Sequence, residues 1–565
     1  MNAKNCGKIV FYILSIHFMI VLPFQACAPL SNITGDTAEN SIDQSSLNFG
    51  KTCEASENLP YRSPLLTKSE VSYILSDLFK NEITANTEIL KKVNELPEIE
   101  VNKDTDDTVF SENNQGKIAS EAYLMKLIDV AQLLFDQYLL TNGIEASCVN
   151  NPVSCFNSFR DNFVVKLWRR PLLAQEIASF TAIYSRAIAF KEKLNLAFLV
   201  SLSSPQFFYK NYLPRANSKE MEYSQYFLAS RLSFFLYNSI PDSNLWNDAV
   251  AGKLSDPLII KSHVDRLLTR EPYASRFVKH NLSRWLGIED DLSISDTITN
   301  DKGVSISLKE LATQQYNKLY NILKDDKNIS EVFYSDKLYI NRSIASYLEL
   351  PNPNQYPTSL ALVNAIPNTL EASYIASPHF AYSTFAEPNK TLVTSRGAFL
   401  TKGLTCRPIP VNELDPNAIT LVLGPNAHEM TQIEVSNIRR NHVSCMACHK
   451  EMDKLGMGAE FVDSFGRYRE SYQPGKNIEI NFSMSFSEEK DVTNFSSFLK
   501  SFSQDERVHS CFVKTIFSKA APVTLESSHP CADEIAKNNG HLGVRSYVKS
   551  IVTSKYFTRS VRSAQ

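Results

Sequence analysis

The chain has 565 residues, of which 43% are hydrophobic and 21% are charged, values close to those of ordinary globular proteins. This length is enough for roughly four domains. The formal net charge is −3, because 58 basic residues oppose 61 acidic ones, so a polybasic nucleic-acid-binding protein is excluded as the default interpretation. Glycine is scarce, at 17 residues, and the sequence has no phosphate-binding loop, zinc-protease or nucleophile-elbow motif.

Residues 1–26 are predicted to be a signal peptide. Lys4 and Lys8 precede an apolar run, residues 9–22, which is too short to span a bilayer but has the length of a signal-peptide core. An Ala-x-Ala pattern centred on Cys27 suits ordinary signal cleavage. The same stretch also resembles a bacterial lipoprotein signal, in which Cys27 would be lipidated and become the new N-terminus. Either alternative predicts an exported protein, in the periplasm or at the outer membrane, and in the second alternative a lipid anchor at Cys27 is the only membrane contact.

Helical modules are predicted to follow a polar tether, residues 27–61, which is rich in Ser, Asn and Asp. Thr67 and Glu70 form a capping-box pattern ahead of an apolar stripe of helical period. Further on, Pro171 marks a break between two helices. These patterns predict helical modules over residues 62–147, 148–215 and 220–345.

The remainder of the chain is predicted to be less regular. Over residues 346–475 proline is frequent and periodicity fades, which predicts a loop-rich module, and residues 476–565 form a C-terminal module. Alternating apolar and polar residues over 478–486 predict a strand, as part of a short β-hairpin near the C-terminus. The expected fold class is therefore mainly α, with several small helical modules and a loop-rich segment.

One motif carries recognisable chemistry: Cys445-Met446-Ala447-Cys448-His449, the CxxCH signature of c-type haem attachment. Two thiols three residues apart, on a turn that enters a helix, can reach the two vinyl groups on one edge of a haem. The following histidine then lies beneath the iron as its proximal ligand. The motif predicts one covalent haem c bound through Cys445 and Cys448, with His449 on the iron.

Other interpretations of the motif remain open at this point. Cys445 and Cys448 could form a disulfide, or they could bind zinc together with His442 and His449. The sixth iron ligand is also open, and the candidates are Met457, Met484, Met452 and His442. The nearby acidic residues Glu451, Asp453 and Glu460 are expected to be surface or capping groups.

The other cysteines predict disulfides, because an exported chain can keep them. A short loop favours the pair Cys148–Cys155, and a helix-sized spacing favours Cys511–Cys531, which leaves Cys53 with Cys406. Six cysteines allow fifteen pairings, so the spacing does not fix the connectivity. Buried free thiols are the alternative.

Beyond the motif itself, a longer pattern resembles a known family. CxxCH is followed by Asp453-x-Leu455-Gly456 and then by Phe465-Gly466-Arg467-Tyr468-Arg469, as in the C-terminal part of planctomycete-type, cytochrome-like exported proteins. Segments such as Trp168-Arg169-Arg170-Pro171-Leu172 resemble the preceding modules of that series, and the resemblance spans residues 60–560. It implies a mostly helical exported protein with a cytochrome-c-like motif, and it implies no substrate.

Two functions of different classes fit these observations. The first is an exported haem c protein in electron transfer or haem-assisted oxidation, with an unidentified redox partner. The second is a non-enzymatic envelope lipoprotein, or binding scaffold, in which Cys445, Cys448 and His449 form a structural disulfide or zinc clamp. No nucleophile-bearing motif singles out a hydrolase, and no nucleic-acid partner is expected.

Overall fold

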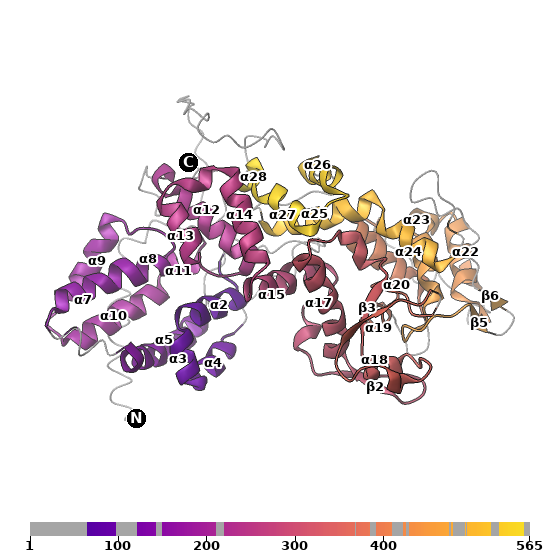
Figure 1. The fold of residues 1–565 in the computed structure, drawn as a ribbon, viewed down its shortest axis with the longest axis horizontal. Coiled ribbons are helices and arrows are strands. Elements are labelled where there is room, and N and C mark those ends of the chain that lie inside the picture. The colour runs from indigo at the N-terminus through magenta and orange to yellow at the C-terminus, as the bar shows by residue number, and fades with distance from the viewer. Residues whose placement is uncertain are drawn as a thin grey trace. The chain divides into compact units, whose positions relative to one another are not determined.

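The computed structural model describes residues 65–97, 121–142, 148, 150–210, 220–367, 369–384, 391–409, 422–424, 429–473, 476–477, 492, 494–520 and 530–558. All of these belong to one compact unit, residues 48–565. The fold is mainly α with short antiparallel hairpins, as predicted (Figure 1). The predicted signal peptide and tether, Cys27, Cys53, Met484 and the predicted strand over residues 478–486 lie outside the described residues.

The N-terminal part consists of helices that begin where the sequence patterns indicate. Thr67 caps α2, and its reciprocal hydrogen bonds with Glu70 confirm the predicted capping box. The break at Pro171 is also confirmed, because α8 ends before it and α9 begins at Ala174. The elements are α2 (Lys68–Leu78), α3 (Lys80–Ala85), α4 (Thr87–Asn94), α5 (Glu121–Asn142), α7 (Pro152–Ser158), η2 (Phe159–Val164), α8 (Val165–Leu167), α9 (Ala174–Tyr184), α10 (Phe190–Ser203) and α11 (Pro205–Phe208).

The middle of the chain continues as helices joined by short turns. Gly252 follows α13 with a φ of 69°, a left-handed conformation that glycine adopts without steric cost. The elements are α12 (Glu220–Tyr237), α13 (Ser243–Val250), η3 (Lys253–Ser255), α14 (Pro257–Leu268), α15 (Tyr273–Phe277), η4 (Val278–Leu282), α16 (Ser283–Trp285), η5 (Asp291–Ser293), α17 (Leu308–Lys324), η6 (Ile329–Val332), α18 (Arg342–Tyr347) and η7 (Pro353–Gln355).

The predicted loop-rich module, residues 346–475, is more helical than expected, because α19 to η10 lie within it and only α24 to α28 follow it. The elements are α19 (Pro378–Ser383), α20 (Val393–Ala398), η8 (Phe399–Leu404), α22 (Gln432–Asn441), α23 (Met446–Gly458), η10 (Ala459–Phe461), α24 (Phe495–Ser503), α25 (Glu506–Ala520), α26 (Pro530–Asn539), α27 (Val544–Val552) and α28 (Lys555–Thr558).

The described strands form three antiparallel hairpins. β1 (Thr297–Thr299) pairs with β2 (Ser305–Ser307), β3 (Lys337–Ile340) pairs with β4 (Ala361–Asn364), and β5 (Ser471–Gln473) pairs with β6 (Lys476–Asn477). In the longest hairpin Leu338 lies opposite Val363. A two-stranded hairpin is marginally stable by itself, so these hairpins depend on the helical cores.

Two large hydrophobic cores organise the helices. One joins residues between Leu65 and Ile240, from α2 to the end of α12. The other joins residues between Leu228 and Phe557, so that α12, α14 and α17 share a core with α20, α23, α25 and α27. The helix that carries CxxCH is therefore packed into the larger core. No helix of the described residues is both long enough and apolar enough to cross a bilayer.

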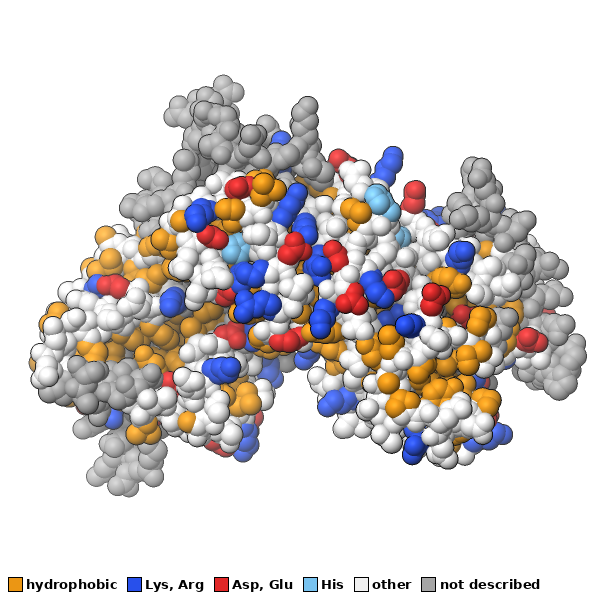
Figure 2. Space-filling model, viewed as in Figure 1, with side chains coloured by type: hydrophobic (Ala, Val, Ile, Leu, Met, Phe, Trp, Pro, Cys, Tyr) orange, Lys and Arg blue, Asp and Glu red, His pale blue; other side chains and the backbone are white. Residues whose placement is uncertain are grey.

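Surface charges are compensated locally where the helices of the larger core meet solvent. Figure 2 shows acidic and basic side chains intermingled across the middle of one face. Among the ion pairs, Lys549 and Arg545 of α27 lie 2.7 and 3.3 Å from the carboxylate of Asp265 in α14. Such partly exposed pairs contribute little free energy individually, but they join helices that are far apart in the sequence.

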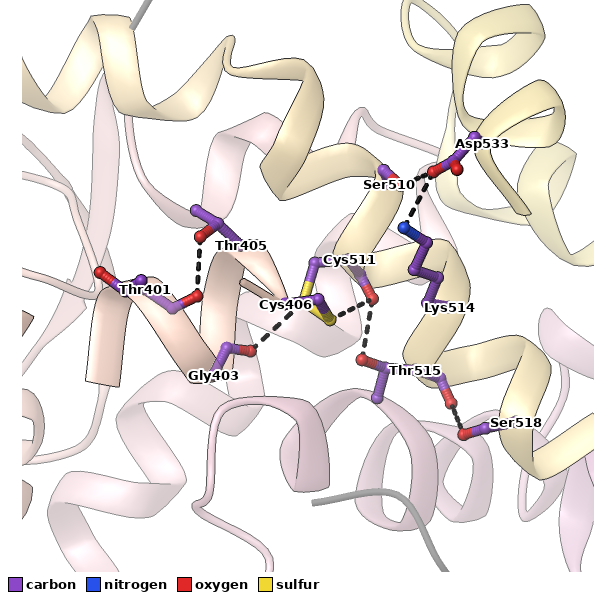
Figure 3. Close-up of a disulfide and its surroundings, with 10 residues drawn as sticks. All are labelled: Thr401, Gly403, Thr405, Cys406, Ser510, Cys511, Lys514, Thr515, Ser518 and Asp533. Carbon is purple, nitrogen blue, oxygen red and sulfur yellow. Dashed lines mark hydrogen bonds and ion pairs between the residues drawn. A yellow bond between two sulfur atoms is a disulfide. The ribbon is translucent and has the colours of Figure 1, made fainter. Parts of the chain in front are cut away.

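Two disulfides lie within the described residues. Cys148 is bonded to Cys155, as predicted. Cys406 is bonded to Cys511, with their Cα atoms 5.1 Å apart, so the predicted pairs Cys511–Cys531 and Cys53–Cys406 are wrong (Figure 3). The physical reason is tertiary: Cys511 lies on the side of α25 that contacts η8, and its sulfur is 3.6 Å from the carbonyl oxygen of Gly403. Cys531 is also disulfide-bonded.

Candidate functional site

The CxxCH segment lies where a tight turn leads from α22 into α23. The backbone amides of Cys445 and Met446 both donate to the carbonyl oxygen of His442, at 2.9 and 2.8 Å. Cys445 is the N-cap of α23, and the amide of His449 donates to the carbonyl oxygen of Cys445 at 3.1 Å. The two cysteines and the histidine are therefore held by the cap and first turn of one helix, as the sequence predicts.

The imidazole of His449 is oriented by a buried carboxylate. Its Nδ1 lies 3.0 Å from Oδ2 of Asp453, one helical turn further along α23, and Asp453 is fully buried. The hydroxyl of Ser436, from α22, donates to the same carboxylate oxygen at 2.7 Å. Because a carboxylate oxygen only accepts, Nδ1 donates to Asp453, and Nε2 is the ring nitrogen left to bind another partner. A carboxylate behind a histidine in this way is the usual support of a metal-binding imidazole.

The expectation that Asp453 and Glu460 are surface or capping groups is wrong, because both are fully buried. Glu451 does lie at the surface, with about half of its side chain exposed. The reason is geometric: residues four apart on a helix share a face, so Asp453 follows His449 onto the side of α23 that meets α22. The His449-x-x-x-Asp453 spacing within a predicted helix is the sequence signal that could have indicated this pair.

A buried ion pair fastens the end of α23 to α20. The guanidinium of Arg396 lies 3.0 Å from the carboxylate of Glu460, and both side chains are fully buried. Arg396 also donates to the carbonyl oxygens of Ala459, Val462 and Asp463. Glu460 accepts in addition from Thr391 and Arg469. The cluster fixes the chain immediately after the CxxCH helix.

α20 and α23 cross at two glycines, where their backbones touch. A methyl group on Gly397 would lie 2.2 Å from the carbonyl oxygen of Met452, and one on Gly456 would lie 1.9 Å from that of Val393. No real Cβ approaches a backbone oxygen so closely, so only glycine allows this crossing. The position of α23, and with it the position of His449, depends on the contact.

We expect Gly456→Ala to lower the free energy of unfolding by about 2 to 3 kcal/mol, because the clash is with backbone and no side chain can move aside. Gly403→Ala is the matched control: a methyl group there meets no described atom within 4 Å, and the change should stay below about 1 kcal/mol. Urea denaturation of both variants measures the difference. Equal stability of the two would show that α20 and α23 are not in contact at Gly456.

The thiols of Cys445 and Cys448 are half-buried and are not bonded to each other. Apolar side chains are exposed beside them, with Val443 79% exposed and Met446 38% exposed. In the last turn of α22, burial lowers the pKa of Arg440, while the carboxylates of Asp453 and Glu451 act in the opposite direction. The motif thus lies at the surface, next to exposed apolar side chains.

The candidate sixth ligands are placed as follows. Met457 is fully buried in the larger core, eight residues along α23 from His449, and Met452 is buried against Gly397, so both are placed to serve packing. His442 accepts from the amide of Ser444 through Nδ1, at 3.3 Å. Across the described ranges, no group of three or more His, Cys, Asp or Glu side chains is arranged to hold a metal ion.

Two family models match separate segments of the chain. One, described as PSD4, a protein of unknown function (DUF1592), matches residues 223–350, and the other, described as PSCyt3, a protein of unknown function (DUF1588), matches residues 376–472. Both are planctomycete-type, cytochrome-c-associated domains, which fits an architecture of several such modules in order. The second match includes the CxxCH segment and α20. No curated protein and no solved structure matches the chain.

Proposed function

We propose that the protein is an exported haem c protein that transfers electrons in the cell envelope, with the haem attached through Cys445 and Cys448. The observation that carries the proposal is the arrangement at the start of α23: two half-buried thiols followed by a histidine whose Nδ1 is held by Asp453. Export follows from the N-terminal sequence pattern, with Cys27 as the site of a lipid anchor.

Cys445, Cys448 and His449 have the chemistry that attachment of a haem c requires. Attachment adds each thiol across a vinyl group, which needs two reduced cysteines that an incoming haem can reach, and both side chains are half-buried at the end of a helix. The apolar side chains of Val443 and Met446 would cover part of the macrocycle. A bound haem would supply a one-electron iron couple at this position.

Asp453 would set the properties of the ligand at His449. The carboxylate accepts from Nδ1, so Nε2 would be the nitrogen available to the iron, and Asp453 would raise the basicity of the imidazole. A more basic ligand favours the oxidised metal, so this residue would lower the reduction potential of a bound haem. The hydroxyl of Ser436 keeps the carboxylate in place.

Covalent haem on the purified chain tests the proposal. The full chain with its own leader is produced in a bacterium with active haem-attachment machinery, and a haem-stained denaturing gel is compared with the pyridine haemochrome spectrum. We expect one c-type haem in the wild type and none in Cys445→Ala/Cys448→Ala. The double variant Cys148→Ala/Cys155→Ala is the matched control and should keep its haem, because it removes another closely spaced pair of cysteines.

Stain intensity is divided by the amount of chain on the same gel, so that a poorly folded variant is not mistaken for one without haem. Absence of covalent haem from the wild type, under conditions where a control cytochrome matures, would overturn the proposal. Equal loss of haem from both double variants would show that attachment depends on folding in general and not on Cys445 and Cys448.

A further inference from the structure

A second cluster of potentially reactive side chains lies away from the CxxCH helix, around Lys318 of α17. The side chain is 91% buried and lines a cavity of about 20 Å³. This volume is enough for one or two water-sized groups. The walls combine leucines with polar side chains from α17, from β3 and from the segment before α19, among them Gln314, Gln315, Glu371 and Ser377.

The amine has only carbonyl partners. Nζ of Lys318 donates to the carbonyl oxygens of Ala372, at 2.8 Å, and Val332, at 3.2 Å. Among the described residues, no ion pair includes this amine. A neutral amine has two N–H bonds and one lone pair, whereas an ammonium has a third N–H that would need an acceptor. Two carbonyl acceptors therefore match the neutral form.

Burial also favours the neutral form of the Lys318 amine. It lowers the pKa of Lys318 to about 7, and this effect outweighs the opposing attraction of Glu331. About half of the molecules would then carry a neutral Lys318 near pH 7. Desolvation of this kind is the usual way in which proteins make a lysine nucleophilic.

The cavity also restricts what could react there. Its volume limits an entering molecule to very few heavy atoms. The amide groups of Gln314 and Gln315 also line the cavity and can donate to a carbonyl oxygen. These walls favour a small carbonyl compound.

We propose that Lys318 forms an imine with a one- or two-carbon aldehyde in this cavity. The lone pair of Nζ attacks the carbonyl carbon, a C–N bond forms, and the carbonyl oxygen takes up a proton to give a carbinolamine. The C–O bond then breaks, water leaves with both former amine protons, and the imine remains. The step needs no oxidant or reductant, and it is independent of the haem.

Reductive trapping tests this directly. The full chain is incubated with acetaldehyde and cyanoborohydride between pH 6 and pH 11, and labelled lysines are located by mass spectrometry. Lys309, which is exposed on the same helix, is the internal control. We expect half-maximal labelling of Lys318 near pH 7, with labelling at pH 7 at least tenfold faster at Lys318 than at Lys309.

Failure of acetaldehyde to label Lys318, or labelling with the pH profile of Lys309, would overturn the proposal. Lys318→Met, which keeps the size of the side chain, must lose the label at this position.

Discussion

Arg396→Ala should lower the free energy of unfolding by about 3 to 5 kcal/mol, the cost of breaking a buried ion pair. Arg396 and Glu460 are both fully buried, so removing the guanidinium leaves the Glu460 carboxylate with less compensating charge inside the protein. Three backbone carbonyl oxygens after α23 lose a donor at the same time. Urea denaturation followed by far-UV circular dichroism measures the change.

Arg407→Ala is the control for this prediction. Arg407 pairs with Glu451 at 3.9 Å, but both side chains are about half exposed, so water replaces the interaction and the loss should stay below about 1 kcal/mol. Equal stability of Arg396→Ala and Arg407→Ala would show that the Arg396–Glu460 pair is not buried in solution and that α20 does not contact η10.

The second large effect is expected at the disulfide shown in Figure 3. Cys406 and Cys511 are 105 residues apart, and the double variant Cys406→Ala/Cys511→Ala should lose about 4 to 5 kcal/mol, because the unfolded chain regains the entropy of an open loop of that length. The Cys148–Cys155 disulfide closes a loop of only 7 residues, and its removal should cost about 2 to 3 kcal/mol.

The comparison is made by denaturation of both double variants beside the wild type, all with their remaining disulfides intact. The contacts around the long-range disulfide remain in the variant, since Thr515 still donates to the carbonyl oxygen of residue 511 and Lys514 still pairs with Asp533. A larger loss from the short loop than from the long one would contradict the entropic explanation.

Local patterns predicted the helices and the position of the motif. The capping box at Thr67, the break at Pro171 and the helix that starts at Cys445 all depend on residues close together in the sequence, and the structure confirms them. The two family-model matches, over residues 223–350 and 376–472, fit an architecture of several modules, and the predicted module boundaries stay predictions. Haem attachment and export stay predictions.

The features that the sequence did not reveal depend on contacts between distant segments. The burial of Asp453 requires α22 to cover one face of α23, and the burial of Glu460 requires Arg396 from α20. Disulfide pairing was wrong at Cys511 for the same reason, because spacing in the sequence carries no information about which face of α25 meets η8. Each of these positions is decided by tertiary packing.

The long-range disulfide has a consequence for how the chain must mature. Cys445 and Cys448 both lie inside the loop that Cys406 and Cys511 close. In an unfolded chain, shorter loops close more readily, so random oxidation would join Cys445 to Cys448 or to Cys406 before it joined Cys406 to Cys511. The pairing in the structure therefore requires that η8 and α25 meet before oxidation, that the two CxxCH thiols are already occupied, or that early disulfides are exchanged later. Attachment of a cofactor to these thiols would itself remove the competing pairings.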